Sequence, residues 1–242
     1  MGKTRLYVAL DKVRGDRVTL DESAYRHLIK VLRLAPGAAI QIFDGAGTEI
    51  DARIEAVARD SVEVALGERR RIPAPACAIT LLVAPPRGER MDLIVQKTTE
   101  LGVRMIVPVA SERGVVKPSP HQQRRWQTIA EEAARQSGRA DVTQIGDPVT
   151  LAQALPLAAA LTTHRFLLWE GERGRALPLA LAAGPRSVAL LVGPEGGFAT
   201  GEIAAAQAVG FASVGLGPRI LRAETAAIVA VALAQAAAGG LA

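Results

Sequence analysis

Cysteine, histidine and aromatic residues are scarce in this chain of 242 residues. Cys77 is the only cysteine, so the sequence excludes an internal disulfide and favours a reducing compartment. Aromatic residues make up 3% of the chain, and we expect aliphatic side chains and alanine to fill the core instead. The three histidines, His27, His121 and His164, lie far apart without a cysteine–histidine ligand spacing. We therefore expect no metal site.

A long apolar run and a secretory signal pattern are also missing. The most apolar stretch, 226–238, is interrupted by Gln235 and is shorter than the roughly 20 residues that a membrane-spanning helix needs. The N-terminus does not show the regions of a signal peptide. We therefore expect a soluble, cytoplasmic protein with no membrane partner. The formal net charge of +5 favours a polyanionic partner such as nucleic acid.

Two short apolar runs near the C-terminus each end in a glycine-containing turn. Run 188–192 leads into the turn 193–197, and run 213–216 leads into the turn 217–222. Such runs predict buried parallel strands, and a helix is expected after each turn. In an open α/β sheet, ligands bind at the carboxyl ends of the strands. The two turns therefore predict a ligand site.

The first turn indicates the character of that ligand. Gly193, Gly196 and Gly197 lack a Cβ atom, so the backbone can adopt positive φ and approach a ligand closely. The turn has no Lys-Ser/Thr pair of the kind a P-loop needs, and the carboxylate of Glu195 would repel a phosphate. The ribose and sulfonium of S-adenosylmethionine fit better. The alternative is an ordinary tight turn without a ligand.

Residues 1–72 predict a small β-domain. Strands are expected over 6–9, 17–20, 39–43, 49–57 and 61–66. A helix over 23–32 should begin at Asp21 or Ser23. Spacing of i, i+3 places His27, Lys30 and Arg33 on one face of that helix, which suits contact with RNA phosphates. The alternatives are a solvated basic face and a histidine used for packing.

A domain boundary is expected at residue 72. The arginine triplet 69–71 is followed by Pro73 and Pro75, and this pattern does not predict a continued strand ladder. Beyond it, strands over 79–84, 105–109, 166–169, 188–192 and 213–216 alternate with helices over 91–101, 121–136, 151–160, 201–209 and 224–238. Gly102 should end the first helix in the left-handed conformation, and Thr200 should cap the fourth.

Several side chains in this second region have two interpretations. Trp126 fits a core anchor better than a base-stacking platform. Glu170 follows a strand, where it would bind a ribose hydroxyl or cap a turn. The last helix is apolar all round, so it must be buried against the sheet, a second subunit or both.

The motif Gly-Pro-Glu-Gly-Gly at 193–197, paired with Leu-Gly-Pro-Arg-Ile-Leu-Arg-Ala-Glu-Thr at 216–225, resembles the SPOUT methyltransferases. In that group the C-terminal elements form a trefoil knot around S-adenosylmethionine. Within it, the chain is similar to the RsmE family, which methylates N3 of uridine 1498 in the 16S RNA of the small ribosomal subunit. Further matches are the His-x-x-x-Val-Leu-Arg signature at 27–33 and the segments 87–91, 96–97, 100–103, 111–117 and 131–139.

The resemblance implies a PUA-like RNA-binding β-barrel over 1–72 and a SPOUT α/β-knot domain with a mostly parallel sheet over 73–242. It also implies S-adenosylmethionine as cofactor, 16S ribosomal RNA as partner and a homodimer. The residues expected to bind the cofactor are Leu168, Glu170, Gly193, Pro194, Glu195, Gly196, Gly197, Leu216, Gly217, Pro218, Ile220, Leu221 and Thr225. Those expected to contact RNA are His27, Lys30, Arg33, Arg87, Lys97, Arg113, Lys117 and Arg139, with a structural role as the alternative for each.

Methyl transfer from a sulfonium requires mainly that donor and acceptor be positioned. Uracil N3 is a poor nucleophile while protonated, so the site should favour the imide anion through a base or a fixed positive charge. Arg222 is the candidate for that charge, and Glu224 is the candidate that fixes Arg222 or the loop. The alternative is that the two form a pair that only locks the turn. Ala223 stands where family patterns vary between Thr and Ala.

Three other functions compete with this hypothesis. A nicotinamide dehydrogenase needs Gly-x-Gly-x-x-Gly after its first strand and an acidic residue about 20 positions later, and neither follows 79–84. A non-catalytic ribosome-assembly factor would have no use for two paired glycine turns. A SPOUT enzyme with another RNA target is opposed only by the N-terminal resemblance.

Overall fold

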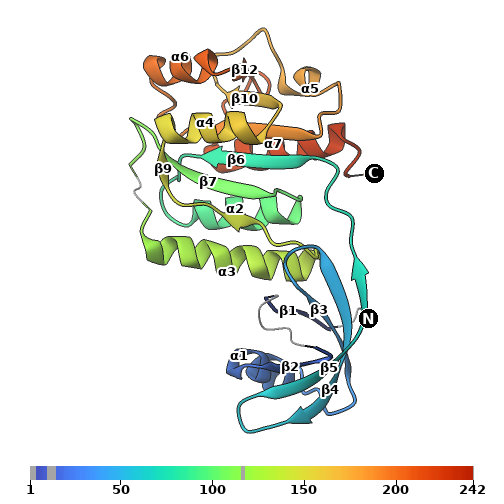
Figure 1. Cartoon of the computed structure of the whole chain (residues 1–242). Helices are drawn as coiled ribbons and strands as arrows, with labels where there is room; N and C mark the ends of the chain where they lie inside the picture. Colours follow the sequence, from blue (N-terminus) through green and yellow to red (C-terminus); the bar gives the residue numbers. More distant parts are fainter. Residues whose placement is uncertain (1–3, 10–14, 116–117, 242) are drawn as a thin grey trace. The chain divides into compact units, whose positions relative to one another are not determined.

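The computed structural model describes residues 4–9, 15–115 and 118–241 (Figure 1). It divides into two compact units. The N-terminal unit comprises residues 1–74 together with 134–142, and the C-terminal unit comprises 75–133 and 143–242. The sequence gives no sign that 134–142 joins the N-terminal unit, because the segment begins within a helix of continuous pattern.

The N-terminal unit is built on a five-stranded sheet of order β1-β3-β4-β5-β2. Its strands are β1 (Thr4–Tyr7), β2 (Arg17–Leu20), β3 (Ala39–Phe43), β4 (Thr48–Val57) and β5 (Val62–Arg71). All neighbours pair antiparallel except β1 and β3, which are parallel. The core alternates along the strands, as in Ile40 and Ile42 or Val62 and Val64, all fully buried.

The arginine triplet lies within β5 and not in a linker. Arg69, Arg70 and Arg71 pair in register with residues 48–50 of β4. The expectation that the ladder ends before them is therefore wrong. Exposed edge positions of an antiparallel sheet accept charge, and Arg70 pairs with Asp51 on the adjacent strand at 3.1 Å. The strand ends immediately before the proline-containing segment 72–75.

The helix of the N-terminal unit is partly a π-helix. Asp21 caps α1 (Glu22–Tyr25) by accepting a hydrogen bond from the Ala24 amide at 3.2 Å, as expected. The chain then continues as the π-helix η2 (Arg26–Val31). In a π-helix the backbone hydrogen bonds run from residue i+5 to residue i, so residues at i, i+3 spacing do not share a face. The expectation that His27, Lys30 and Arg33 lie on one helical face is therefore wrong. Arg33 lies beyond the helix in the left-handed region, at φ 56°, which non-glycine residues seldom adopt.

The segment 134–142 is tied to the N-terminal sheet by backbone hydrogen bonds. The Gly47 amide donates to the carbonyl of Ala140, and the Val142 amide donates to that of Gly45, both at 3.0 Å. Phe43 packs between Ala140 and its neighbours. This docking places the last turn of α3 (Pro120–Ser137) in the N-terminal unit, while the rest of that helix belongs to the C-terminal unit.

The C-terminal unit is built on a parallel sheet of order β12-β10-β11-β6-β7-β8, with β9 paired to β7. The strands are β6 (Ala78–Val83), β7 (Met105–Ala110), β8 (Gln144–Ile145), β9 (Val149–Thr150), β10 (His164–Leu168), β11 (Ser187–Val192) and β12 (Ala212–Val214). The helices are α2 (Arg90–Glu100), α3, α4 (Leu151–Leu161), α5 (Leu177–Ala180), α6 (Thr200–Ala208) and α7 (Ala223–Ala237).

Helices cover both faces of this sheet (Figure 1). Leu82, Ala189 and Leu191 pack into one cluster with residues of α4 and α6. The alternate strand positions, such as Leu81 and Leu190, point to the opposite face and are equally buried. There α7 contacts β6, β11, α2 and α5. The arrangement is the doubly wound α/β sheet that the alternating elements predict.

Most predicted boundaries in this unit are confirmed to within a few residues, and one cap is wrong. Gly102 follows α2 at φ 88°, as expected. Trp126 is 3% exposed and its Nε1 donates to Asp92, which confirms the core anchor. Thr200 is the first residue of α6 and not its cap. The cap is Ala199, whose amide donates to Glu202 at 2.9 Å, because glutamate three residues into a helix can satisfy that donor without a capping hydroxyl.

The last helix is only partly enclosed by its own chain. Ala227, Ala230 and Val231 are fully buried, whereas Ile228 and Val229 remain half-exposed. Gln235 is 1% exposed and bonds to the backbone of Cys77 and Gly102. None of the helices in the described ranges is long and apolar enough for a bilayer crossing.

Candidate active site

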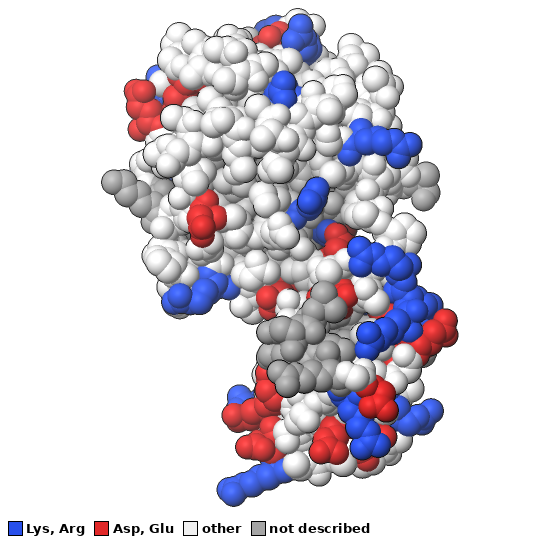
Figure 2. Space-filling model, viewed as in Figure 1, with Lys and Arg blue, Asp and Glu red and all other residues white. Residues whose placement is uncertain are grey.

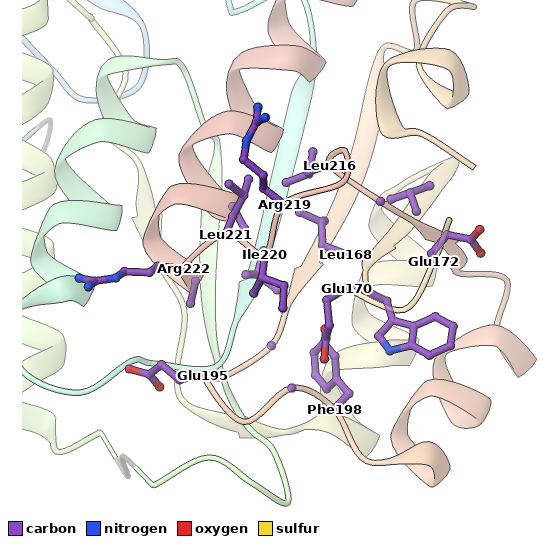
Figure 3. Close-up of a pocket in the computed structure, with 18 of the residues that line it drawn as sticks. Leu168, Glu170, Glu172, Glu195, Phe198, Leu216, Arg219, Ile220, Leu221 and Arg222 are labelled. Atoms are coloured by element: carbon purple, nitrogen blue, oxygen red, sulfur yellow. The ribbon is translucent and has the colours of Figure 1, made fainter. Parts of the chain in front are cut away.

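A cavity of about 390 Å³ opens at the carboxyl ends of three adjacent parallel strands, β10, β11 and β12 (Figure 3). Its lining comes from the loops that follow these strands and from the first turn of α7. The volume lies within the range of small-molecule sites, about 300–1,000 Å³. The position is the one expected for a ligand in an open α/β sheet.

The glycine-rich loop 193–197 forms one wall of the cavity. Gly197 has φ 67° and its amide donates to the Pro194 carbonyl at 2.9 Å, which closes a tight turn. A Cβ atom at Gly197 would lie 2.6 Å from Oε1 of Glu170. Of the three glycines whose freedom the sequence suggested, Gly197 alone uses positive φ. Gly193 is needed for a different reason, because a Cβ there would lie 2.9 Å from the Phe198 ring.

The second loop, 215–222, forms the facing wall. It starts at Gly215, whose amide donates to the Arg175 carbonyl at 2.8 Å, and turns at Gly217 with φ 99°. Ile220 is 80% exposed at the cavity. An apolar side chain that is held open to solvent beside a cavity is available to cover a ligand.

Most residues predicted to bind the cofactor line this cavity. They are Leu168, Glu170, Gly193, Pro194, Glu195, Gly196, Gly197, Leu216, Gly217, Ile220 and Leu221. Pro218 and Thr225, which are both exposed, do not line it. The lining residues that were not predicted are Trp169, Glu172, Arg173, Val192, Phe198, Val214, Gly215, Arg219, Ala223 and Ala226. Position next to a strand end could have identified many of them.

Two carboxylates, Glu170 and Glu172, lie on one side of the cavity. Figure 3 shows Glu170 and Glu172 across from Arg222 and Glu195. Glu172 Oε1 accepts hydrogen bonds from the amides of Gly174 at 2.7 Å and Arg175 at 3.0 Å. These backbone bonds hold the pKa of Glu172 below its usual value. This side can accept hydrogen bonds from ligand hydroxyl groups.

Arg222 and Glu224 do not form the pair considered from the sequence. Arg222 is the N-cap residue of α7, and its guanidinium has no hydrogen-bond or ion-pair partner within the described part of the chain. Glu224 is 9% exposed and its Oε1 lies 3.8 Å from Nε of Arg90. Its Oε2 is buried and has no hydrogen-bond partner among the described residues. The interaction of Glu224 is therefore with α2. Arg222 is an exposed lining residue of the cavity, and Figure 3 shows its guanidinium extending away from Ile220 and Glu170.

Arg90 also contacts the glycine-rich loop. Its Nη1 lies 2.9 Å from Oε1 of Glu195, and the same oxygen accepts the Arg87 amide at 3.2 Å. Partial burial acts to raise the pKa of Glu195, but the amides of Glu195 and Arg87 and the charge of Arg90 outweigh it and lower the pKa. In the sequence, Arg90 is distinguished only as part of the matching segment 87–91. Its contacts join positions that lie over 100 residues apart, which no local pattern signals.

Two of the basic residues predicted to face RNA in the C-terminal unit border the glycine-rich loop. Besides the Arg87 amide, Nη1 of Arg113 donates to the Gly196 carbonyl at 3.1 Å, and both residues are exposed. Lys97 lies apart from them at the end of α2, where it pairs with Glu100 at 2.9 Å. Lys117 lies outside the described residues.

The remaining predicted RNA contacts belong to the N-terminal unit. His27 is half-buried, and its buried Nε2 has no hydrogen-bond partner among the described residues, whereas Lys30 and Arg33 are exposed. The Arg139 side chain is 9% exposed and pairs with Asp141 at 2.6 Å, which fits the structural alternative. Figure 2 shows several basic side chains next to one another along the right-hand edge of the view, with acidic side chains beside them.

Comparisons with known proteins agree with this architecture. Residues 73–235 match the RNA methyltransferase domain family, and residues 20–66 match the RNA methyltransferase PUA domain. Ribosomal RNA small subunit methyltransferase E of Synechocystis is 35% identical over 232 residues, which cover 94% of this chain and 76% of that protein.

Solved structures are similar over nearly the whole length. A Legionella pneumophila protein in complex with the cofactor SAM superposes with a TM-score of 0.88 at 33% identity, covering 98% of each chain. Ribosomal RNA small subunit methyltransferase E of Neisseria gonorrhoeae, bound to S-adenosyl methionine, has a TM-score of 0.86 at 32% identity, covering 97% of this chain and 98% of its own. The two-unit architecture, the strand-end cavity and these matches together show that the chain belongs to the RsmE family of ribosomal RNA methyltransferases.

Proposed function

We propose that this protein transfers the methyl group of S-adenosylmethionine to N3 of uridine 1498 in 16S ribosomal RNA. The observation that carries the proposal is the cavity between the two glycine turns, with Glu170 and Glu172 on one side and, on the other, Arg222, which has no ion-pair partner among the described residues. Family membership and the cofactor found in two similar structures support the same reaction.

The residues of the cavity fit the proposed cofactor. A cavity of about 390 Å³ is large enough for an adenosyl ligand. Glu170 and Glu172 can accept hydrogen bonds from ribose hydroxyls, and the cradle at Gly197 leaves no room for a Cβ atom. Apolar walls at Leu168 and Leu221 would pack against the base. The bound cofactor supplies an activated methyl group on a sulfonium, and the protein positions the acceptor.

Arg222 is the residue that we assign to activating the acceptor. A guanidinium remains charged at any physiological pH, and a fixed positive charge lowers the cost of forming the uracil imide anion. Because Arg222 has no partner in the described chain and lines the cavity, its charge is available to the substrate. Glu224 does not line the cavity, and its Oε2 is buried with no hydrogen-bond partner among the described residues. We therefore assign it to supporting the loop and not to contact with N3.

RNA contact is assigned to basic residues of both units. In the C-terminal unit, Arg87 and Arg113 are exposed beside the glycine-rich loop, where a phosphate next to the target uridine would lie. In the N-terminal unit, Lys30 and Arg33 are exposed at the end of the π-helix. A non-glycine residue held in the left-handed region, as Arg33 is, occurs more often at binding sites than elsewhere.

We also propose that the protein acts as a homodimer through α7. Ile228, Val229 and Leu233 of this helix are half-exposed, although the helix contains hardly any polar residues. A second copy packed on α7 would bury them and gain roughly 25 cal/mol for each Å² of apolar surface. To test the dimer, cofactor binding is measured while the protein is diluted until the dimer dissociates. A cofactor affinity that does not depend on the protein concentration would contradict this proposal. The trefoil knot that the resemblance implies stays a prediction.

The experiment for the proposed reaction measures transfer of labelled methyl groups from S-adenosylmethionine. Unmethylated small ribosomal subunits, free 16S RNA and large subunits are compared as acceptors. We expect incorporation into 16S RNA and none into large subunits. Binding to small subunits without incorporation would instead support the non-catalytic assembly factor, and incorporation only into another RNA would support a SPOUT enzyme with a different target.

A further inference from the structure

Arg90 occupies a position that its own helix disfavours. It is the first residue of α2, where the exposed N–H groups of the helix carry partial positive charge and favour acidic side chains. Asp92, in the same turn, has the expected sign. A residue that breaks a local rule at such a place usually has a compensating role elsewhere in the structure.

The contacts of Arg90 identify that role. Its guanidinium reaches Glu195 of the glycine-rich loop at 2.9 Å and Glu224 of α7 at 3.8 Å. It thereby joins three segments that are separate in the sequence, on the side of the cavity where Figure 3 shows Arg222 and Glu195. Glu224 is nearly buried, and Arg90 is its ion-pair partner among the residues described. A buried carboxylate without such a partner is strongly disfavoured.

Among the described residues, Arg90 is the arginine whose side chain pairs with both carboxylates, Glu195 and Glu224. Glu195 and Glu224 contribute two negative charges, and Arg222 contributes one positive charge. With Arg90 the four groups sum to zero, and without it they leave a net negative charge. A negative charge near the acceptor would oppose formation of the uracil imide anion.

We propose that Arg90 is a positioning residue for methyl transfer, which holds Glu195 and Glu224 in place and offsets their charge so that Arg222 can act on the uracil. This inference rests on the proposed function. The exposed pair with Glu195 contributes little to folding, because the Arg90 side chain is 41% exposed. Loss of Arg90 also leaves the nearly buried Glu224 without its ion-pair partner among the described residues, so we expect a lower unfolding midpoint together with a lower rate. Removing Glu195 as well should restore the rate and not the midpoint.

The test compares Arg90→Gln, Glu195→Gln and the double variant with the wild type. Single-turnover methylation of small subunits is measured at saturating cofactor, with the cofactor Kd from calorimetry and the thermal midpoint for each protein. We expect Arg90→Gln to lose about tenfold in rate, which is the change that a shift of about one pKa unit in the acceptor would cause. The cofactor Kd should stay within about threefold, because Arg90 does not line the cavity.

The double variant distinguishes two roles of Arg90, which are offsetting the charge of Glu195 and holding the Glu195 side chain in place. If Arg90 offsets the charge of Glu195, removing both charges should restore the rate to within about threefold of Glu195→Gln alone. A matched control is Arg125→Gln. Arg125 has a similar exposure, lies on α3 and pairs with Asp92 of α2, the helix that carries Arg90. It does not line the cavity. It should retain the wild-type rate.

Each result decides the inference. A rate for Arg90→Gln equal to that of the wild type would overturn it, as would a double variant slower than Arg90→Gln. Equal losses in Arg125→Gln and Arg90→Gln would also overturn it, since any charge change near α2 would then suffice. A wild type that transfers no methyl group to any RNA would overturn the proposed function and this inference together, whereas the other outcomes leave the proposed function intact.

Discussion

Substitution of Gly197 by alanine tests how closely the first glycine turn fits its ligand. Gly197 has φ 67°, a conformation that costs an L-residue about 1–2 kcal/mol. The new Cβ would also lie 2.6 Å from Oε1 of Glu170, so either the loop or the glutamate must move. In the free protein the loop can relax into another conformation. Binding of the cofactor would then have to restore the original loop conformation, so the free energy of this strain would weaken binding.

A cost of about 1–2 kcal/mol corresponds to a cofactor Kd raised about 5- to 30-fold. Calorimetric titration with S-adenosylmethionine measures this change directly. The matched control is Gly37→Ala, because Gly37 has φ 91° but no atom within 4 Å of a built Cβ and lies in the N-terminal unit. That variant should lose similar folding stability in urea and keep the wild-type Kd.

Two outcomes would refute this reasoning. If Gly197→Ala bound the cofactor as tightly as the wild type, the turn would not contact it. If Gly37→Ala weakened binding to the same degree, the effect would arise from general destabilisation of the chain and not from the cavity.

Three further substitutions have distinct expected outcomes. Arg222→Ala should slow single-turnover methylation by about 10²–10³-fold, as loss of an anion-stabilising group does. The cofactor Kd should change less than about threefold. Equal losses in rate and in cofactor affinity would show that Arg222 only supports the cavity. Gln235→Leu should lower the free energy of unfolding by about 2–4 kcal/mol, because it leaves buried backbone groups of Cys77 and Gly102 unpaired. Urea unfolding measures this loss, with Gln136→Leu, a substitution of an exposed glutamine, as the control. Glu195→Gln should be less stable than the wild type at neutral pH. The pKa of Glu195 is lower in the folded protein than its ordinary value. The difference should therefore shrink as the pH falls below the ordinary pKa and disappear once the pH has passed the lowered one. A difference that persisted or grew in acid would contradict the sign.

The order of elements and the place of the cavity follow from local patterns. Buried runs such as 188–192 alternate with helical periods, and glycine turns after two strands mark the edge where ligands bind. The wall formed by Gly193 and Gly197 was therefore predictable. Glu172 and Phe198 were not predicted, although both stand within a few residues of a strand end.

Other features depend on contacts that a one-dimensional pattern does not contain. The π-helix at 26–31 and the left-handed Arg33 arise where the N-terminal unit packs a helix against its sheet, and the periodicity of the residues predicts an ordinary helix. Segment 134–142 belongs to the N-terminal unit through hydrogen bonds with Gly45 and Gly47. The contacts of Arg90 with Glu195 and Glu224 span more than 100 residues.

The central claim, methylation of uracil N3, is tested most directly by nucleoside mass spectrometry. Small subunits without the modification are incubated with the protein and S-adenosylmethionine, and the 16S RNA is digested to nucleosides. We expect 3-methyluridine, absent when the cofactor is withheld. A different methylated nucleoside would contradict the assigned acceptor atom, and no methylated nucleoside in either small subunits or free 16S RNA would contradict the account as a whole.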